Sequence, residues 1–152
     1  MRVVAQRVTR ATVRRRDVSP VEERRIGHGL VLLAGFHTSD DEPTLRWMAS
    51  KCLGLRLFPD AAGAMNRAVG DCGGAVLVVP NFTLYGDASK GRRPGFAAAA
   101  PPELAAQRFD TFVALLAAGP VPVQAGWFQA AMHVELVNDG PVTLLLERDA
   151  AE

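Results

Sequence analysis

The segment Asn138–Thr143, with the sequence Asn-Asp-Gly-Pro-Val-Thr, holds chemistry that ordinary strand composition does not explain. Gly140 can adopt backbone conformations closed to other residues, and Pro141 has no amide hydrogen to donate. Such a pair turns bare carbonyls and amides outward, where they can contact a ligand at close range. The alternative is a plain turn, because Asp-Gly is a strong hairpin signal and apolar runs flank the segment. Either way we expect a tight connection between two strands, with the Gly140-Pro141 isomer left open.

The residues used by common catalytic devices are scattered along the chain. His28, His37 and His133 lie far apart, without the spacing of a helical metal site. Cys52 and Cys72 also lack a second cysteine or histidine at metal-ligand spacing, so both are interpreted as packing thiols and no metal site is expected. The sequence has no serine elbow, paired carboxylates or nucleotide-binding glycine pattern. If the chain is an enzyme, its backbone and its substrate must do much of the work.

The composition is that of an ordinary soluble globule. The chain has 152 residues, 49% of them hydrophobic and 22% charged, which predicts one domain spanning residues 1–152. No apolar run approaches the roughly 18 residues that a membrane span needs, so no membrane association is expected. Charged residues stand where a signal peptide would need its apolar centre, which predicts a cytoplasmic protein.

The formal net charge of +1 gives no overall attraction to nucleic acid, so an RNA contact would have to use a local cluster. There are two basic clusters, one of which is residues 14–16. The other comprises Lys90, Arg92 and Arg93, and we call the loop that carries it, residues 86–100, the basic loop. Taken alone, either cluster could be a solvated loop.

Hydrophobic periodicity predicts strands at both ends of the chain and helices between them. Residues 2–9 and 11–16 alternate with period two and predict a first hairpin. The apolar runs 29–36 and 75–79 predict buried central strands, the second ended by Pro80.

Two helices are expected, the first over residues 43–55 and the second beginning near Pro101 and stopped by Gly119-Pro120. Strands, two helices and further strands indicate an α/β fold: a layered, barrel-like mixed sheet with helices packed on one side.

Several segments, in this order, resemble the D-aminoacyl-tRNA deacylases, and the resemblance covers nearly the whole chain. They are Gln6-Arg7-Val8, Val76–Val79 running into Phe82-Thr83-Leu84, Gly91–Phe96, and Asn138–Thr143. Of the two family signatures, Asn-X-Gly-Pro-Val-Thr matches fully. The other, Ser-Gln-Phe-Thr-Leu, departs because Pro80-Asn81 replaces Ser-Gln, which removes a hydroxyl and shortens an amide side chain by one methylene. An opening proline also resembles a branch that edits L-alanyl-tRNA, whereas Phe82 and Arg7 resemble the D-specific branch.

The resemblance implies hydrolysis of the ester bond of tRNA carrying a D-amino acid, or of glycine mischarged on tRNA(Ala). It also implies a homodimer in which each pocket is completed by the Gly-Pro pair of the other subunit, and it implies no cofactor. The Gly140 carbonyl would occupy the space of an L side chain, a steric rejection that accepts many D-amino acids.

The resemblance assigns roles to residues of this chain. The catalytic set is Phe82, Thr83, Gly140 and Pro141; the substrate-binding set is Asn81, Leu84, Phe128, Met132, Asn138 and Arg7; and Lys90, Arg92 and Arg93 contact tRNA. The amides near Phe82 and Thr83 would hold the oxyanion. Phe128 and Met132 would contact the terminal adenosine. Whether Thr83 acts as a nucleophile or only positions the ester stays open, and we favour water activated with help from the ribose 2′-OH.

Two other classes of function stay open. One is a dimeric RNA-binding or amino-acid-binding module without activity, which the Pro80-Asn81 departure would explain. The other is an esterase acting on small molecules through Cys72 or Thr83.

Overall fold

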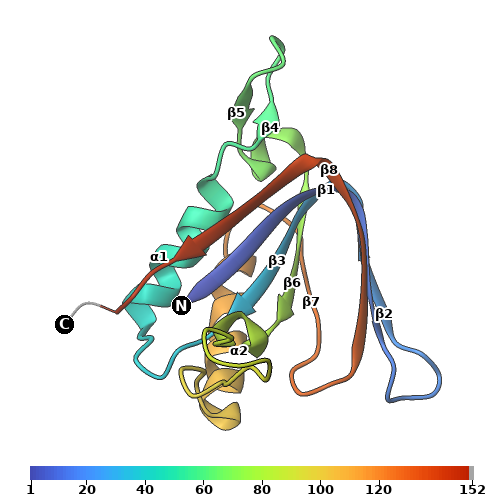
Figure 1. Cartoon of the computed structure of the whole chain (residues 1–152). Coiled ribbons are helices and arrows are strands. Elements are labelled where there is room, and N and C mark those ends of the chain that lie inside the picture. Colours follow the sequence, from blue (N-terminus) through green and yellow to red (C-terminus); the bar gives the residue numbers. More distant parts are fainter. Residues whose placement is uncertain (151–152) are drawn as a thin grey trace.

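The computed structural model describes residues 1–150. Its main sheet has the strand order β2-β1-β3-β6-β7, and β8 pairs with β1 on the side away from β3 (Figure 1). The parallel pairings are β3 with β6 and β6 with β7, and the pairs formed by β1 are antiparallel. The strands are β1 (Arg2–Arg15), β2 (Glu23–Ile26), β3 (Gly29–Gly35), β6 (Ala75–Pro80), β7 (Val123–Ala125) and β8 (Met132–Glu147).

The predicted hairpin of residues 2–9 and 11–16 is wrong, because β1 is one strand over Arg2–Arg15. The first half of β1 pairs with β3 and the second half with β2. Its register against β8 shifts between Gln6 and Val8 and again between Val8 and Arg10. These irregularities change which face each side chain occupies, which is how a bulge interrupts an alternation without ending the strand.

The predicted turn at Asn138–Thr143 is also wrong. β8 runs without interruption from Met132 to Glu147 and pairs with β1 on both sides of Gly140-Pro141. Both ribbons bend sharply at this point (Figure 1). The Gly-Pro pair thus sits at a bend in a long two-stranded ribbon rather than at a hairpin end.

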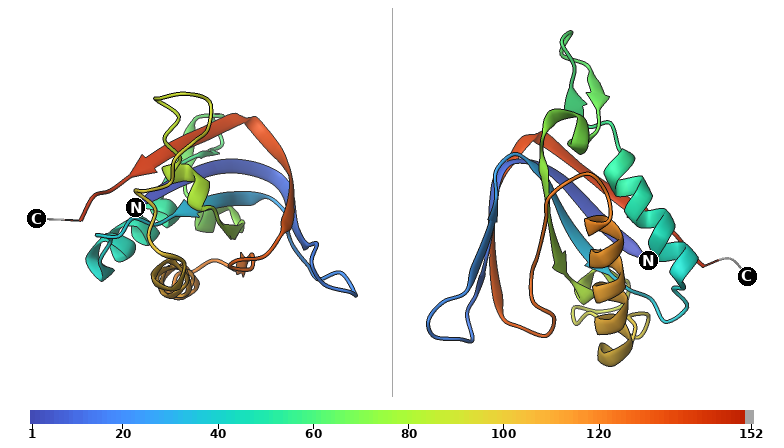
Figure 2. Two further views of the ribbon diagram at one scale, coloured as in Figure 1. Left: turned by 60° about the horizontal axis from the view of Figure 1, so that its bottom comes forward. Right: turned by 180° about the vertical axis from the view of Figure 1, so that it is seen from behind.

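Two helices cover one face of the sheet, as Figure 2 shows. Helix α1 (Glu42–Gly54) begins after Asp41, whose side chain accepts a hydrogen bond from the amide of Thr44. Helix α2 (Pro102–Ala117) begins with a proline. Proline suits this position because an N–H group in the first turn would have no acceptor within the helix. Between helices and sheet lies a core that includes Met48, Phe112 and Leu30. This arrangement confirms the predicted α/β fold with a barrel-like mixed sheet and helices on one side.

A second apolar cluster fills the opposite face, where β1, β2 and β8 curl over the sheet. It contains Val13, Ile26, Leu77 and Val79 among its buried members. A small hairpin of β4 (Phe58–Pro59) and β5 (Met65–Arg67) projects beyond the main sheet (Figure 1). None of the helices within residues 1–150 is both long and apolar enough to cross a membrane.

Candidate active site

The end of β6 leads directly into the first candidate motif. Pro80 lies opposite Ala34 of β3, and the amide of Asn81 donates to the Ala34 carbonyl oxygen at 2.7 Å. The chain then forms a short 3-10 helix, η2 (Phe82–Tyr85). The amides of Phe82 and Thr83 start this turn and so have no partner inside it. Among the described residues no other hydrogen-bond acceptor is found for them, which leaves two adjacent donors for an oxyanion.

The hydroxyl of Thr83 donates a hydrogen bond to the side-chain oxygen of Asn81. This acceptor is an amide oxygen, which does not take up a proton near neutral pH. Within residues 1–150 no histidine or carboxylate hydrogen-bonds to Thr83. The contact therefore fits a threonine that positions a substrate better than one that attacks it, because a hydroxyl nucleophile needs a neighbouring base.

A cavity of about 500 Å³ opens beside η2. It is walled by apolar side chains from η2, the basic loop, α2 and the segment between β7 and β8. The lining residues are Pro80, Asn81, Phe82, Phe96, Ala99, Ala100, Pro101, Pro102, Ala105, Trp127, Phe128, Gln129, Ala130 and Met132. No charged side chain is found among these described lining residues, which suits a flat, neutral group such as a nucleobase.

Two aromatic contacts shape this cavity. Phe82 is 56% exposed, and its ring meets that of Phe96 edge to face, with 5.1 Å between the centroids. On the other side the Phe128 ring lies 6.3 Å from that of Phe109 in α2. Phe82, Phe128 and Met132 are thus brought to one cavity, together with Asn81.

Tyr85, the last residue of η2, is buried and anchors the turn to the sheet. Burial, with a smaller contribution from the nearby Asp40, raises the pKa of the Tyr85 hydroxyl, so the group stays neutral at physiological pH. Arg2 stacks over the Tyr85 ring at 4.7 Å and donates to the Leu84 carbonyl oxygen at 3.0 Å. Leu84 therefore supports η2 through its backbone, and the structure does not place it on the cavity lining.

The second motif is held by Arg7. Its Nε donates to the Asp139 carbonyl oxygen at 2.9 Å, and its guanidinium also donates to the Leu57 carbonyl oxygen at 2.6 Å. Arg7, assigned to the substrate-binding set, thus contacts a carbonyl of the Asn138–Thr143 segment. A Cβ atom on Gly140, whose φ is 151°, would lie 2.7 Å from the amide nitrogen of Val142, so only glycine fits here. The Gly140-Pro141 peptide bond is cis.

Asn138 closes this bend with its side-chain amide. The amide of Val142 donates to Asn138 Oδ1 at 2.8 Å, and Asn138 Nδ2 donates to Thr143 Oγ1 at 3.0 Å. Asn138 and Arg7 therefore fix the two sides of the Gly-Pro pair. Both act as supports for Gly140-Pro141, because Asn138 bonds within the bend and Arg7 joins Asp139 of the bend to Leu57.

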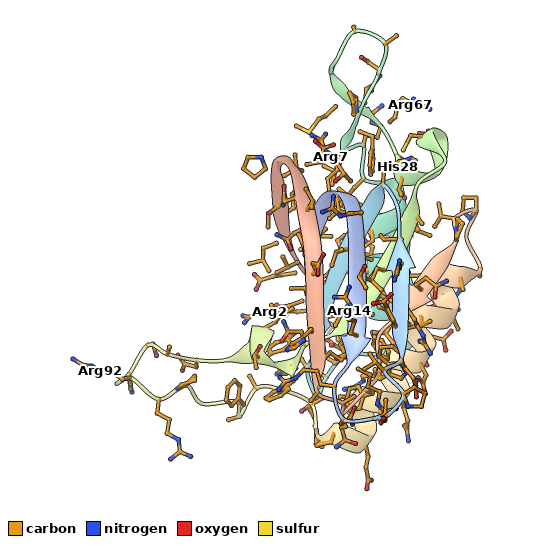
Figure 3. The ribbon with its side chains drawn as sticks, turned by 90° about the vertical axis from the view of Figure 1, so that its right-hand side faces the viewer. Arg2, Arg7, Arg14, His28, Arg67 and Arg92 are labelled. Carbon is orange, nitrogen blue, oxygen red and sulfur yellow. The ribbon has the colours of Figure 1, made fainter. Side chains whose placement is uncertain are left out.

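Within one chain the two motifs do not meet. Thr143 lies opposite Gln6 on β1, whereas Pro80 lies beside Ala34, which itself pairs with Val3. Figure 3 shows Arg7 near the upper end of the sheet and Arg2 well below it, at the height of Arg14. The structure thus brings Asn81, Phe82, Phe128 and Met132 to one cavity. Thr83 is not among the lining residues and is linked to the cavity through its hydrogen bond to Asn81. Arg7, Asn138, Gly140 and Pro141 lie elsewhere.

The basic loop is exposed, and Figure 3 shows Arg92 projecting into solvent from it. Asp87 and Gly95 pair their backbones at its base, with bonds of 2.8 and 2.9 Å. The other basic cluster is largely neutralised, since Arg14 pairs with Glu23 and Glu135, and Arg15 with Asp17.

Cys72 lies before β6, at the opposite end of that strand from Thr83. Its thiol donates to the Val69 carbonyl oxygen, and His28 Nε2 donates to the Cys72 carbonyl oxygen at 2.9 Å. That histidine nitrogen carries a proton and cannot activate the thiol. Within residues 1–150 no group of three or more histidine, cysteine, aspartate or glutamate side chains is arranged to hold a metal ion.

The sequence is similar to a known family over nearly its whole length. Residues 4–147 match the family model described as D-Tyr-tRNA(Tyr) deacylase. The chain belongs to the D-Tyr-tRNA(Tyr) deacylase family. A D-aminoacyl-tRNA deacylase of Desulfitobacterium hafniense is 52% identical over 98% of each chain. One of Thermomicrobium roseum is 51% identical over 100% of this chain and 96% of its own.

Solved structures agree with the family's fold. The c-Myc DNA Unwinding Element Binding Protein matches with a TM-score of 0.89 and 37% identity, over 99% of this chain and 100% of that one. A probable eukaryotic D-amino acid tRNA deacylase matches in fold with a TM-score of 0.81 at 18% identity, over 95% of this chain and 97% of that one. The predicted family is confirmed, and with it the prediction of a hydrolase.

Sequence reasoning missed three residues of the candidate site. Arg2 supports η2, and Phe96 and Trp127 line the cavity. Phe96 belongs to the Gly91–Phe96 stretch, so its aromatic character was a usable signal. Arg2 gave none, because its contact depends on β1 passing close to η2.

Proposed function

We propose that the protein hydrolyses the ester bond that joins a D-amino acid to the 3′ end of tRNA, releasing free tRNA. The observation that carries this proposal is the pair of free amides at Phe82 and Thr83 beside a neutral apolar cavity. The amides suit the oxyanion of ester hydrolysis, and the cavity suits the terminal adenosine. Family membership supports the same reaction.

No described side chain acts as a base beside Thr83, so the substrate itself helps to activate the attacking water. Thr83 holds the ester while its hydroxyl hydrogen bond goes to Asn81, and the terminal ribose 2′-OH assists the attacking water. Phe128 and Met132 hold the terminal adenine, and Leu84 supports η2 through its backbone. Lys90, Arg92 and Arg93 of the basic loop contact tRNA phosphates near the cavity.

Selection for the D configuration comes from Gly140-Pro141, with Arg7 and Asn138 as its supports. These residues lie away from the cavity beside η2 of their own chain. The protein therefore acts as a homodimer in which the Gly-Pro pair of one subunit closes the cavity of the other. An L side chain would collide with the Gly140 carbonyl, whereas a D side chain or glycine would not.

A deacylation assay tests this function. The purified protein is given D-Tyr-tRNA, Gly-tRNA(Ala), L-Ala-tRNA(Ala) and L-Tyr-tRNA at equal concentration. We expect rapid release of D-tyrosine and glycine, with both L esters spared. Preferential release of L-alanine would instead identify an L-alanyl-tRNA deacylase, the alternative that Pro80 at the cavity favours. No turnover of any ester, despite tRNA binding, would identify a non-catalytic RNA-binding protein.

A further inference from the structure

Arg24 lies on the inward face of β2, where an arginine requires a partner. Along this strand Arg24 is half-buried and Ile26 is buried, whereas the side chain of Arg25 between them is 72% exposed. Alternation therefore turns Arg24 toward the interior of the sheet. A guanidinium group carries five N–H donors and loses water when buried, so its partners must be close.

The partner of Arg24 is Trp127, a wall of the cavity. The guanidinium carbon lies 4.5 Å from the centroid of the Trp127 ring, and Arg24 also donates to the Ala125 carbonyl oxygen. Trp127 lines the cavity together with Phe128 and Met132. The backbone amide of Trp127 donates to the Met132 sulfur at 3.4 Å, so these two lining residues are held together.

This contact also bridges two strand edges. β2 and β7 stand at the two ends of the β2-β1-β3-β6-β7 order, and in the described part of the chain no ladder joins them. The side chain of Arg24 on β2 joins the two edges by its contacts with Ala125 of β7 and with Trp127 just after it. The segment after β7 has little regular structure of its own, and Gln129 within it has a φ of 53°. Its shape therefore depends on contacts of this kind.

We propose that Arg24 is a positioning residue that fixes the cavity wall through Trp127 and so controls binding of the substrate's terminal nucleoside. This inference rests on the proposed function for the identity of that nucleoside. Arg24 does not touch the amides of Phe82 and Thr83. Its loss weakens binding of the RNA terminus and leaves the ester chemistry nearly intact.

Steady-state kinetics with D-Tyr-tRNA measure the effect. Removing a partly buried cation-π contact corresponds to roughly a tenfold loss of affinity, so Arg24→Ala should raise KM about tenfold. Its kcat should stay within a factor of about two. Arg24→Lys keeps the charge but not the planar fork, so its KM should lie between those of the parent and Arg24→Ala. Arg25→Ala is the matched control on the neighbouring exposed position and should leave both constants unchanged. A fall in kcat with KM unchanged would overturn the proposal.

A double-mutant cycle separates this role from general stabilisation. Trp127→Leu removes the ring over which Arg24 stacks, so adding Arg24→Ala to that variant should cost little more. Additive increases in KM would show that Arg24 acts elsewhere. Circular dichroism identifies any variant that fails to fold, and the Lys variant then takes the place of the Ala variant in the cycle.

Adenosine 5′-monophosphate tests the inference without turnover. The chain has two tryptophans, so in a Trp47→Phe background the fluorescence reports Trp127 alone. We expect the nucleotide to change this emission, and Arg24→Ala to weaken its binding about tenfold and to expose Trp127 to acrylamide. If the nucleotide bound the parent and the Ala variant equally, the inference would fail while the proposed function stood. If the nucleotide bound as expected but no D-aminoacyl ester were hydrolysed, the proposed function would fail alone.

Discussion

Arg2 and Arg7 stand on the same strand, and each donates a hydrogen bond to one of the two signature segments. Arg2 reaches the Leu84 carbonyl oxygen of η2, and Arg7 reaches the Asp139 carbonyl oxygen beside Gly140. Five strand residues span about 16 Å, so β1 spaces the two motifs apart within one chain. This separation is the reason for proposing that the Gly-Pro pair of one subunit closes the cavity of the other.

The first prediction concerns Arg7. Charge-assisted hydrogen bonds contribute about 1.5–3 kcal/mol each, so Arg7→Ala should loosen the Gly-Pro pair and raise hydrolysis of L-Tyr-tRNA by roughly tenfold or more. The measurement is the ratio of D to L deacylation rates. Asp139→Ala separates the two contacts of Arg7 with this residue, because it removes the carboxylate, which lies 3.6 Å from Arg7 Nε, but keeps the carbonyl oxygen that Arg7 binds. If Arg7→Ala spared L-Tyr-tRNA as well as the parent does, Arg7 would have no part in selection.

The second prediction concerns Arg2. Without its contacts to Leu84 and Tyr85, the amides of η2 lose their fixed direction. Arg2→Ala should lower kcat by about tenfold, with little change in KM. Glu147→Ala breaks the ion pair of Arg2 but leaves its bond to Leu84, so this control should keep nearly full activity. Equal loss in both variants would assign the effect to the ion pair instead.

The third prediction concerns the basic loop. Neutralising Lys90, Arg92 and Arg93 together should weaken tRNA binding and reduce the slope of log K against log salt by about 2, as expected for three lost phosphate contacts. Filter binding at several salt concentrations gives this slope.

The control for the basic loop removes three arginines that already have carboxylate partners. They are Arg15, Arg25 and Arg46. The control variant loses three positive charges, as the loop variant does. Because its arginines lie in ion pairs, its salt slope should change less than that of the loop variant. An unchanged slope in the loop variant would place the RNA phosphates elsewhere.

The fourth prediction concerns the thiols. Cys72→Ser should retain turnover, since the His28 ring hydrogen-bonds the Cys72 carbonyl and not its sulfur. Burial raises the pKa of the Cys52 thiol to about 12, so this group is neutral and unreactive at physiological pH. Iodoacetamide should therefore leave the deacylation rate unchanged. Complete inactivation by this reagent would favour a thiol esterase.

Local signals predicted the central strands and both helices well. The apolar run from Gly29, the capping residue Asp41 and Pro80 at a strand end all act through their immediate neighbours. The family signatures likewise pointed to Phe82 and Thr83, which both lie in η2, and of the two Phe82 lines the cavity.

The failures all involve pairing between distant segments. Asp139-Gly140 carries a hairpin signal, but the partner of both halves of β8 is β1, and local sequence does not encode that choice. The hairpin predicted from residues 2–9 and 11–16 is instead one strand, β1, whose register against β8 shifts between Gln6 and Arg10. Arg24 was missed for the same reason, because its partner Trp127 lies in the segment after β7, far along the chain.

The central claim is that backbone amides and the substrate's own 2′-OH carry catalysis, with Thr83 as a positioning group. One measurement compares single-turnover hydrolysis of D-Tyr-tRNA with that of the same ester carrying a 2′-deoxy terminal ribose, in the parent protein and in Thr83→Ala. We predict that Thr83→Ala retains measurable turnover, reduced by about 10²-fold to 10³-fold, and that the 2′-deoxy ester is slowed at least about 10²-fold in the parent. Normal cleavage of the 2′-deoxy ester together with complete loss of activity in Thr83→Ala would contradict the account and make Thr83 the nucleophile.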